Sequence, residues 1–446
     1  MQLTRRGRVR ALRTTGAAAA VVLVLLAGAA PAASAATGSG AGTAAEPVAA
    51  PSPTTRGLDR EALQRRLDAV HEAGMYGAYS SVRDGRAQWT GATGFADVDT
   101  RRPTTPDMRH RVGSITKTFT ATAVLQQSAR GRIGLDRPVG DYLPGLVPGE
   151  RGRKITVRML LNHTSGIDDY ITEAFPSLKE NSPKSLDDFR YRTLRPATLI
   201  GYGLNRPQLF EPGTDWSYSN TNYLLLGELL RKVTGEDPER VITRDVIRRA
   251  GLRATYFPGT DPVIKGPHSG MYENLRGLID PPRDYSEYNM TMAGTAGALI
   301  STTQDLNTFY RALLQGDLLP AAQLREMRTT VPVKGPDGAV AIRYGLGLYS
   351  TDTPCGPAWG HDGGVFGAST QAMSSADGKH QFAAGYNLSG YQRADASGAP
   401  VPHPVDAAID RLRDQALCGT STPATGRQAA PRGLHESLDA RLTAPR

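Results

Sequence analysis

Residues 112–117 read Val112-Gly113-Ser114-Ile115-Thr116-Lys117, and Lys117 is the only lysine of the chain that lies three positions after a serine. Residues 118–125 are mostly apolar or small, which predicts a buried helix that begins at Ser114. Positions i and i+3 share one face of a helix, so the lysine can reach the serine hydroxyl. Serine is a weak nucleophile without a neighbouring base, and lysine becomes that base when its pKa falls from about 10.4. The stretch therefore predicts Ser114 as a nucleophile and Lys117 as its base.

A second polar segment, Tyr218-Ser219-Asn220, stands just before an apolar stretch from Tyr223 that is typical of a helix. A phenol beside a lysine can pass protons to a leaving group, and an amide can hold a substrate carbonyl. Tyr272-Glu273-Asn274 has the same spacing and competes for this role. We prefer the first segment because a junction between a loop and a helix suits a cleft. The structural alternative for either tyrosine is a half-buried core residue.

A third segment reads Gly360-His361-Asp362-Gly363-Gly364. Paired glycines in a strand allow another backbone to approach closely. Backbone N–H groups here and at Ser114 are suited to an oxyanion hole. His268-Ser269-Gly270 has a similar pattern, but it lies in a proline-rich loop. A histidine alone is more often structural than catalytic. We therefore interpret His361 as a site residue only because the first two segments are also present.

The two ends of the chain predict matching elements. Asp59 begins a helix whose apolar residues recur with helical spacing up to Gly74. Strand-like runs at 79–82 and 87–90 flank Asp84-Gly85, and runs at 369–373 and 382–388 flank Asp377-Gly378, both typical of hairpins. A second helix follows and ends at Gly419. We therefore expect a sheet built from both chain ends, with a mainly helical insertion over about 130–290.

The composition is that of a globular protein, with 39% hydrophobic and 21% charged residues in a chain of 446. Residues 1–36 contain five arginines and no acidic residue, and without them the net charge of +9 falls to +4. No basic run is interleaved with aromatic residues. We therefore expect no nucleic-acid partner.

Residues 1–36 have the three parts of a secretory signal peptide, a basic start, an apolar run over 17–29 and small residues ending in Ala33-Ser34-Ala35. We expect cleavage near Ala35, a secreted protein and no stable membrane anchor, with a retained anchor as the alternative. Residues 37–56 predict a flexible linker. We expect the catalytic domain over 57–420 and a disordered or trimmed tail over 421–446.

The chain has two cysteines, Cys355 and Cys418. In an exported protein an even pair predicts one disulfide, and two buried free thiols are the alternative.

Taken together, the three segments resemble the serine β-lactamase-related family, and most closely its extracellular D-alanyl-D-alanine carboxypeptidases. The resemblance covers residues from about Leu58 to Cys418. Besides the three segments, it is carried by Leu161-Asn162-His163-Thr164-Ser165-Gly166, Tyr218-Ser219-Asn220-Thr221-Asn222-Tyr223, Ala296-Gly297-Ala298-Leu299-Ile300-Ser301-Thr302-Thr303-Gln304-Asp305-Leu306 and Tyr344-Gly345-Leu346-Gly347-Leu348. Cys355 and Cys418 also stand where similar proteins place a disulfide.

The resemblance implies an α+β fold of the β-lactamase/transpeptidase type, with an antiparallel sheet flanked by helices, a helical lobe and a cleft between them. It implies that Ser114 forms an acyl-enzyme, that Lys117 deprotonates it and that Tyr218 shuttles protons. Asn220 and His361 would bind substrate, and the N–H groups of Ser114 and Gly364 would form the oxyanion hole. We expect no metal or organic cofactor, and we expect a monomer.

Four positions depart from the family pattern and bear on the substrate. Asp362 and Gly364 stand where the carboxypeptidases usually have threonine, Tyr349 replaces an arginine, and Met292 stands where a large aromatic is expected. The residues that would anchor the C-terminal carboxylate of a substrate are therefore missing. We expect poor selectivity for substrates with a free C-terminal carboxylate.

Several functions remain open on this scaffold. The first is a D-alanyl-D-alanine carboxypeptidase that acts on peptidoglycan peptides. The others are an esterase or amidase, a β-lactamase, and an inactive protein that binds β-lactams or wall peptides, so the partner is a small peptide, ester or β-lactam. An α/β-hydrolase is disfavoured because the chain has no G-x-S-x-G motif.

Overall fold

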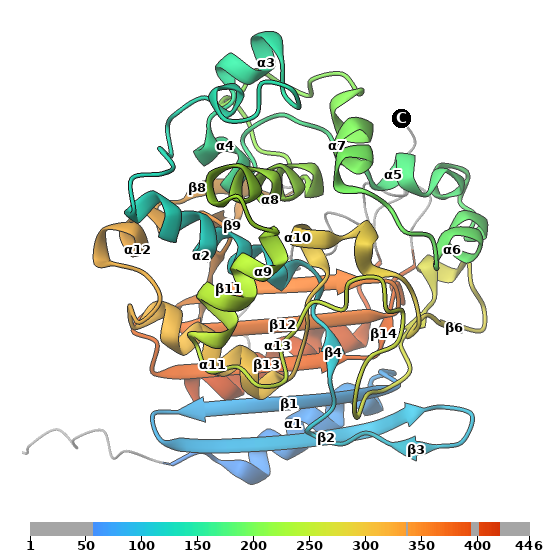
Figure 1. Cartoon of the computed structure of the whole chain (residues 1–446). Helices are drawn as coiled ribbons and strands as arrows, with labels where there is room; N and C mark the ends of the chain where they lie inside the picture. The colour runs from blue at the N-terminus through green and yellow to red at the C-terminus, as the bar shows by residue number, and fades with distance from the viewer. Residues whose placement is uncertain (1–56, 336–337, 394–400, 420–446) are drawn as a thin grey trace, which may run out of the picture. The chain divides into compact units, whose positions relative to one another are not determined.

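The computed structural model describes residues 57–335, 338–393 and 401–419. The predicted signal peptide (1–36), linker (37–56) and tail (421–446) lie outside these residues. The described chain is built on a nine-stranded sheet in which all neighbouring strands are antiparallel (Figure 1). In spatial order the strands are β3 (Arg102–Pro103), β2 (Ala87–Asp97), β1 (Gly77–Asp84), β13 (His380–Tyr386), β12 (Ala368–Ser375), β11 (Gly356–Val365), β10 (Tyr349–Thr353), β9 (Val340–Tyr344) and β8 (Val331–Lys334).

The two ends of the chain meet in this sheet. Strand β1 pairs with β2 on one side and with β13 on the other, so the blue and orange strands lie side by side in Figure 1. The two predicted hairpins turn at Gly85 and Gly378, whose φ angles of 55° and 68° favour glycine. The predicted α+β fold, with an antiparallel sheet made from both chain ends, is confirmed.

One face of the sheet is covered by the first and last helices, α1 (Arg60–Glu72) and α13 (Pro404–Cys418). The Asp59 carboxylate caps α1 by accepting a hydrogen bond from the Ala62 N–H at 2.9 Å. Gly419 ends α13 with a φ of 64°, the left-handed conformation common after a helix. The apolar faces of both helices are buried with sheet residues in one cluster.

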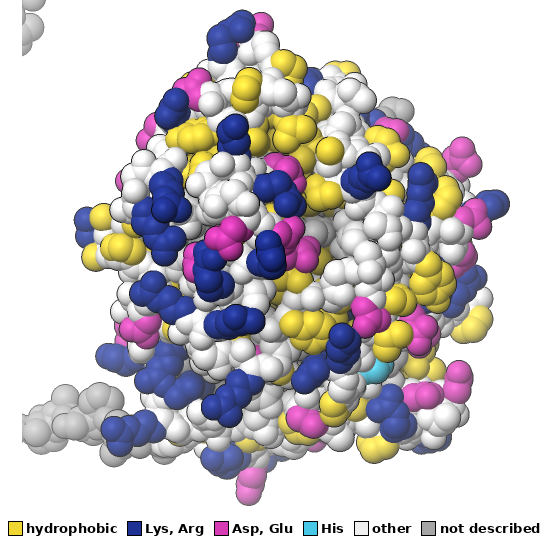
Figure 2. Space-filling model, in the orientation of Figure 1, with side chains coloured by type: hydrophobic (Ala, Val, Ile, Leu, Met, Phe, Trp, Pro, Cys, Tyr) yellow, Lys and Arg dark blue, Asp and Glu magenta, His cyan; other side chains and the backbone are white. Residues whose placement is uncertain are grey.

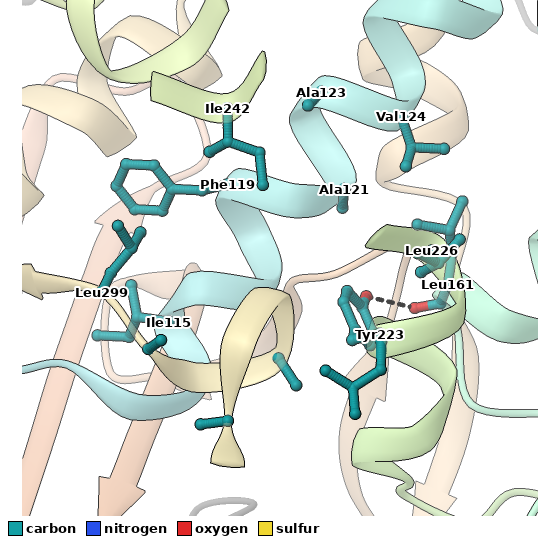
Figure 3. Packing of buried hydrophobic residues seen from close by; sticks show 14 of the residues in the cluster. Ile115, Phe119, Ala121, Ala123, Val124, Leu161, Tyr223, Leu226, Ile242 and Leu299 are labelled. Atoms are coloured by element: carbon teal, nitrogen blue, oxygen red, sulfur yellow. Dashed lines mark hydrogen bonds between the residues drawn. The ribbon is translucent and has the colours of Figure 1, made fainter. Parts of the chain in front are cut away.

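The opposite face carries α11 (Thr303–Leu314) and the helices that surround α2 (Thr116–Ala129). Every residue of α2 from Thr116 to Gln127 is buried, as the sequence predicts. In Figure 3, Phe119 lies near Ile242 and Leu299, and the Tyr223 hydroxyl donates a hydrogen bond to the Leu161 carbonyl at 2.7 Å. The other helices are α3 (Gly149–Lys154), α4 (Val157–Leu161), α5 (Ile171–Ala174), α6 (Lys184–Phe189), α7 (Pro196–Leu204), α8 (Asn220–Thr234), α9 (Pro238–Ile242), α10 (Gly294–Gly297) and α12 (Ala321–Met327).

Strands β8, β9 and β10 extend the sheet beyond β11 and were not predicted from the sequence. Strand β10 pairs with β11 only from Gly356 to Gly360. The next residues of β11, from His361 onward, are therefore not paired with β10 and can face the segment that carries Ser114. Two small sheets complete the described chain, β4 (His110–Arg111) with β7 (Ile300–Ser301), and β14 (Leu388–Ser389) with β5 (Tyr272–Glu273) and β6 (Arg283–Asp284).

Figure 2 shows basic and acidic side chains interspersed on one face of the molecule. Ion pairs occur at the surface of the described chain, for example between Arg244 and Glu236 and between Arg158 and Asp136. None of the helices in the described part of the chain is long and apolar enough to cross a membrane.

Cys355 and Cys418 form the predicted disulfide, which joins the turn between β10 and β11 to the end of α13. Their Cα atoms lie 5.5 Å apart and the cysteines are 63 positions apart in the sequence. We expect the double substitution Cys355→Ser/Cys418→Ser to lower the free energy of unfolding by about 4 kcal/mol, because the bond restricts the unfolded chain. Equilibrium denaturation of both proteins measures this difference. A loss below about 1 kcal/mol would contradict the chain-entropy argument.

Candidate active site

Ser114 lies in a single 3-10 turn, η1 (Gly113–Ile115), which leads directly into α2. The predicted helix therefore begins as a 3-10 turn at the serine. Lys117, on the first turn of α2, places its Nζ 2.9 Å from Ser114 Oγ. Ser114 is 6% exposed and Lys117 is fully buried. The structure thus brings together the two residues of the first segment. Of the two, only Ser114 retains some exposure to solvent.

Lys117 Nζ also donates hydrogen bonds to Asn220 Oδ1 and to the carbonyl oxygen of Ala296, each at 2.7 Å. Both of these oxygens can only accept a hydrogen bond. A neutral lysine amine has two N–H bonds and one lone pair. When the two N–H bonds point at Asn220 and Ala296, the lone pair is left for the Ser114 hydroxyl. The geometry therefore allows the neutral amine to accept the Ser114 proton.

The surroundings of Lys117 favour that neutral form. Burial lowers the pKa of Lys117 from 10.5 to about 7, and the carboxylates of Asp169 and Asp362 act in the opposite direction. The amine is therefore divided between its charged and neutral forms near neutral pH. A general base is most effective when its pKa lies close to the working pH.

Tyr218 is fully buried beside the same pair. Burial raises the pKa of its hydroxyl well above 10, and a hydrogen bond with Ser114 acts in the opposite direction. Lys117 Nζ lies 4.8 Å from the centre of the Tyr218 ring. The phenol is protonated at neutral pH and is placed to donate a proton next to Ser114 Oγ.

His163, in the loop between α4 and α5, contacts the segment that carries Tyr218. The His163 ring lies 4.2 Å from the Tyr218 ring, centre to centre. Its Nδ1 accepts a hydrogen bond from the Ser219 N–H at 3.1 Å. In the sequence His163 is recognisable only as part of the segment Leu161–Gly166, and nothing there indicates this contact.

Asp169 is a residue of the site that sequence analysis missed. Its Oδ2 accepts hydrogen bonds from the Asn220 backbone N–H at 2.7 Å and from Asn220 Nδ2 at 2.8 Å. The only signal in the sequence is the acidic pair Asp168-Asp169 shortly after Gly166. Nothing in that signal indicates contact with a residue 51 positions away.

Strand β11 runs directly against the Ser114 turn, as the glycines predict. A Cβ atom at Gly363 would lie 2.0 Å from the Val112 carbonyl oxygen and 2.8 Å from the Ser114 nitrogen. A Cβ atom at Gly113 would lie 2.7 Å from the Gly364 nitrogen, and the φ of Gly113 is +53°. The Ser114 turn and β11 are therefore in close backbone contact, and these are the two segments whose N–H groups, at Ser114 and Gly364, would form the predicted oxyanion hole.

His361 and Asp362 are buried residues of this strand. Burial lowers the pKa of His361 from 6.5 to about 3, so the imidazole is neutral. Its Nε2 lies 3.0 Å from the Tyr344 hydroxyl. Asp362 is 7% exposed. The pKa values of Tyr218 and Tyr344 are raised mainly by the burial of each tyrosine, and the negative charge of Asp362 raises both further. Strand β11 thus offers a carboxylate and a neutral imidazole, and no cation.

The other two departures from the family pattern are also buried near the site. The Tyr349 ring lies 5.6 Å from the His361 ring, centre to centre. The Met292 carbonyl accepts a hydrogen bond from the Tyr170 hydroxyl at 2.5 Å, and the Met292 side chain lines a small apolar cavity with Phe175 and Phe366.

The competing segments have structural roles. The Tyr272 hydroxyl accepts a hydrogen bond from the Val98 N–H, and Glu273 accepts one from Gly367 N–H at 2.8 Å. His268 Nδ1 is paired with the Gly266 carbonyl in its own loop. Within residues 57–335, 338–393 and 401–419, no group of three or more His, Cys, Asp or Glu side chains is arranged to hold a metal ion.

Comparisons with known proteins match the chain to one family and to relatives with several named activities. The family description Beta-lactamase matches residues 60–392. The chain is 41% identical to a D-stereospecific amidohydrolase from Streptomyces sp., whose solved structure aligns with a TM-score of 0.71 over 81% of this chain and 100% of that one. It is 27% identical to Penicillin-binding protein 4* of Bacillus subtilis (strain 168) over 71% of this chain and 69% of that protein. It is 31% identical to Esterase EstB of Burkholderia gladioli over 48% of this chain and 57% of that protein.

Proposed function

Since this chain belongs to the beta-lactamase family and is a serine hydrolase, we propose that it cleaves amide bonds of D-configured acyl groups through an acyl-enzyme on Ser114. The similarity to the Streptomyces D-stereospecific amidohydrolase supports this choice, because it covers the whole of that protein. The observation that carries the proposal is the hydrogen-bonded set of Ser114, Lys117 and Asn220, with Tyr218 beside it.

The proposed reaction has two halves. In the first, neutral Lys117 accepts the Ser114 proton while Oγ attacks the amide carbonyl, and the N–H groups of Ser114 and Gly364 stabilise the oxyanion. Tyr218 delivers a proton to the departing amine and recovers one from protonated Lys117. In the second half, water attacks the ester on Ser114 and releases the acid, with the proton moving back along the same groups. Asn220 faces the acyl group.

Residues of β10 and β11 favour a substrate without a C-terminal carboxylate. A carboxypeptidase needs a cation or strong hydrogen-bond donors for that carboxylate. Here His361 is neutral, Asp362 carries an acid and Tyr349 stands in place of an arginine. Two like charges about 4 Å apart repel by about 1 kcal/mol in water and more in a partly buried site. This repulsion alone weakens the binding of a substrate with a free carboxylate severalfold, relative to its uncharged amide.

We expect kcat/KM for a D-aminoacyl amide to exceed that for the same compound extended by a free-acid D-alanine by at least about fivefold. The L-configured amide should be a poor substrate. The matched variant Asp362→Asn should bring the kcat/KM values for the amide and for the free acid closer together. Because the same ratio is measured within each enzyme, any change in the pKa of Lys117 cancels. A wild-type preference for the free acid that is unchanged in Asp362→Asn would instead support a D-alanyl-D-alanine carboxypeptidase.

The carboxypeptidase acting on peptidoglycan peptides is the second candidate, supported by the similarity to Penicillin-binding protein 4*. A chromogenic β-lactam and a small ester, assayed in parallel, distinguish a β-lactamase or an esterase, and binding without turnover of any of them indicates an inactive receptor. We also infer that the protein is secreted, which is supported by the signal pattern of residues 1–36 and by a disulfide, since disulfides persist in oxidising compartments.

A further inference from the structure

The loop between α4 and α5 places an acidic residue behind the catalytic set. The loop is held to the start of α8 by two side-chain hydroxyls, since the Asp168 carbonyl accepts hydrogen bonds from Thr221 Oγ1 at 2.7 Å and from Ser219 Oγ at 3.2 Å. The next residue, Asp169, is thereby fixed beside Asn220. None of the three segments that carry Ser114, Tyr218 and His361 includes Asp169.

The hydrogen bonds of Asp169 determine which way the Asn220 amide points. A carboxylate can only accept hydrogen bonds, so the atom of Asn220 that faces Asp169 Oδ2 must be the amide nitrogen. The other Asp169 oxygen accepts a hydrogen bond from the Ile171 N–H at 2.9 Å, which fixes the carboxylate at the start of α5. Asn220 Oδ1 is therefore turned toward Lys117 Nζ.

We propose that Asp169 is a positioning residue that, through Asn220, directs the lone pair of Lys117 at the Ser114 hydroxyl. The proposal rests on the proposed function of Ser114 and Lys117. If the Asn220 amide were reversed, its NH2 group would face the amine. Lys117 would then turn its lone pair toward Asn220, away from Ser114. With Asp169 in place, Asn220 and Ala296 take up both N–H bonds of the neutral amine.

The charge of Asp169 adds a second, separable effect. Several elements bring titratable groups to Lys117: β11 brings His361 and Asp362, the segment before α8 brings Tyr218, and α8 brings Tyr223. His361 is neutral and both tyrosines are protonated at neutral pH. The negative charges that favour protonated Lys117 are therefore those of Asp169 and Asp362. Removal of one of them favours the neutral amine at lower pH.

Two substitutions separate these effects. The readout is the second-order rate of Ser114 labelling by a fluorophosphonate, measured from pH 5 to 10, which does not depend on the preferred amide. Asp169→Ala removes the acceptor, so we expect the plateau rate at high pH to fall about tenfold or more. Asp169→Asn keeps one acceptor oxygen for Asn220 and loses the charge. We expect it to retain a plateau within about threefold of the wild type, with the acid limb about one pH unit lower.

Asp168→Asn is the matched control, since its carboxylate is paired with Arg206 and it is not among the groups that act on Lys117. The Asp168→Asn variant should leave the acid limb of the labelling rate at the wild-type pH. Melting temperatures of all variants establish that they fold. Equal plateaus in wild type and Asp169→Ala, or an acid limb that does not move in Asp169→Asn, would overturn the role of Asp169 alone. Labelling of a residue other than Ser114 in the wild type would overturn the proposed function.

Discussion

Replacement of Ser114 by alanine is expected to lower kcat by on the order of 10⁴-fold or more, because the nucleophile of a covalent mechanism is removed. The remaining groups still bind substrate and oxyanion, so substrate affinity should change little. The measurement is turnover of the preferred amide, together with mass spectrometry after exposure to a fluorophosphonate or a labelled penicillin. The wild type should carry a single adduct on Ser114, and the variant none.

Ser80 offers a matched control for this experiment. It is a fully buried serine on β1 whose hydroxyl donates a hydrogen bond to the Ala383 carbonyl at 3.0 Å. Ser80→Ala should keep both the adduct on Ser114 and most of the turnover. An adduct on any residue other than Ser114, or turnover in Ser114→Ala within tenfold of the wild type, contradicts the mechanism.

The parts of the fold that the sequence predicts well are those decided by neighbouring residues. The hairpin at Gly85 has a two-residue turn and the hairpin at Gly378 a four-residue connection, and both place a glycine at a positive φ that few other residue types adopt. Helices α1 and α13 follow from apolar spacing and from residues that begin or end a helix. Strands β8 to β10 escaped prediction because they are short and are stabilised by pairing within the folded sheet.

The contacts of the site also fall into those that neighbouring residues predict and those that depend on the tertiary fold. Ser114 and Lys117 are three positions apart on one helical turn, so the sequence alone predicts their contact. Asp169 meets Asn220 only because the α4–α5 loop folds onto the start of α8, and His163 meets Tyr218 for the same reason. The burial of Asp362 beside the catalytic groups also depends on how β11 meets the Ser114 turn, which no local pattern reports.

The second large effect is expected at Lys117. Lys117→Arg should lower kcat/KM by about 10³-fold at every pH, because a guanidinium stays protonated and cannot serve as a base. Lys117→Met should be equally inactive, since it is similar in length and has no titratable group. Arginine keeps a positive charge near Asp169 and Asp362, whereas methionine removes it. Comparable losses in both variants therefore identify proton transfer, rather than charge, as the missing function.

The pH dependence of the wild type tests the same assignment without a substitution. A lysine can accept a proton only as the neutral amine, so kcat/KM should be low below the pKa of Lys117 and rise with pH through about 7. The neighbouring groups titrate elsewhere, since the pKa of His361 is about 3 and that of Tyr218 is well above 10. The profile should therefore show one acid limb near 7 and then a plateau. An acid limb near pH 4, or a Lys117→Arg enzyme that keeps more than about a tenth of wild-type kcat/KM, would show that another group accepts the Ser114 proton.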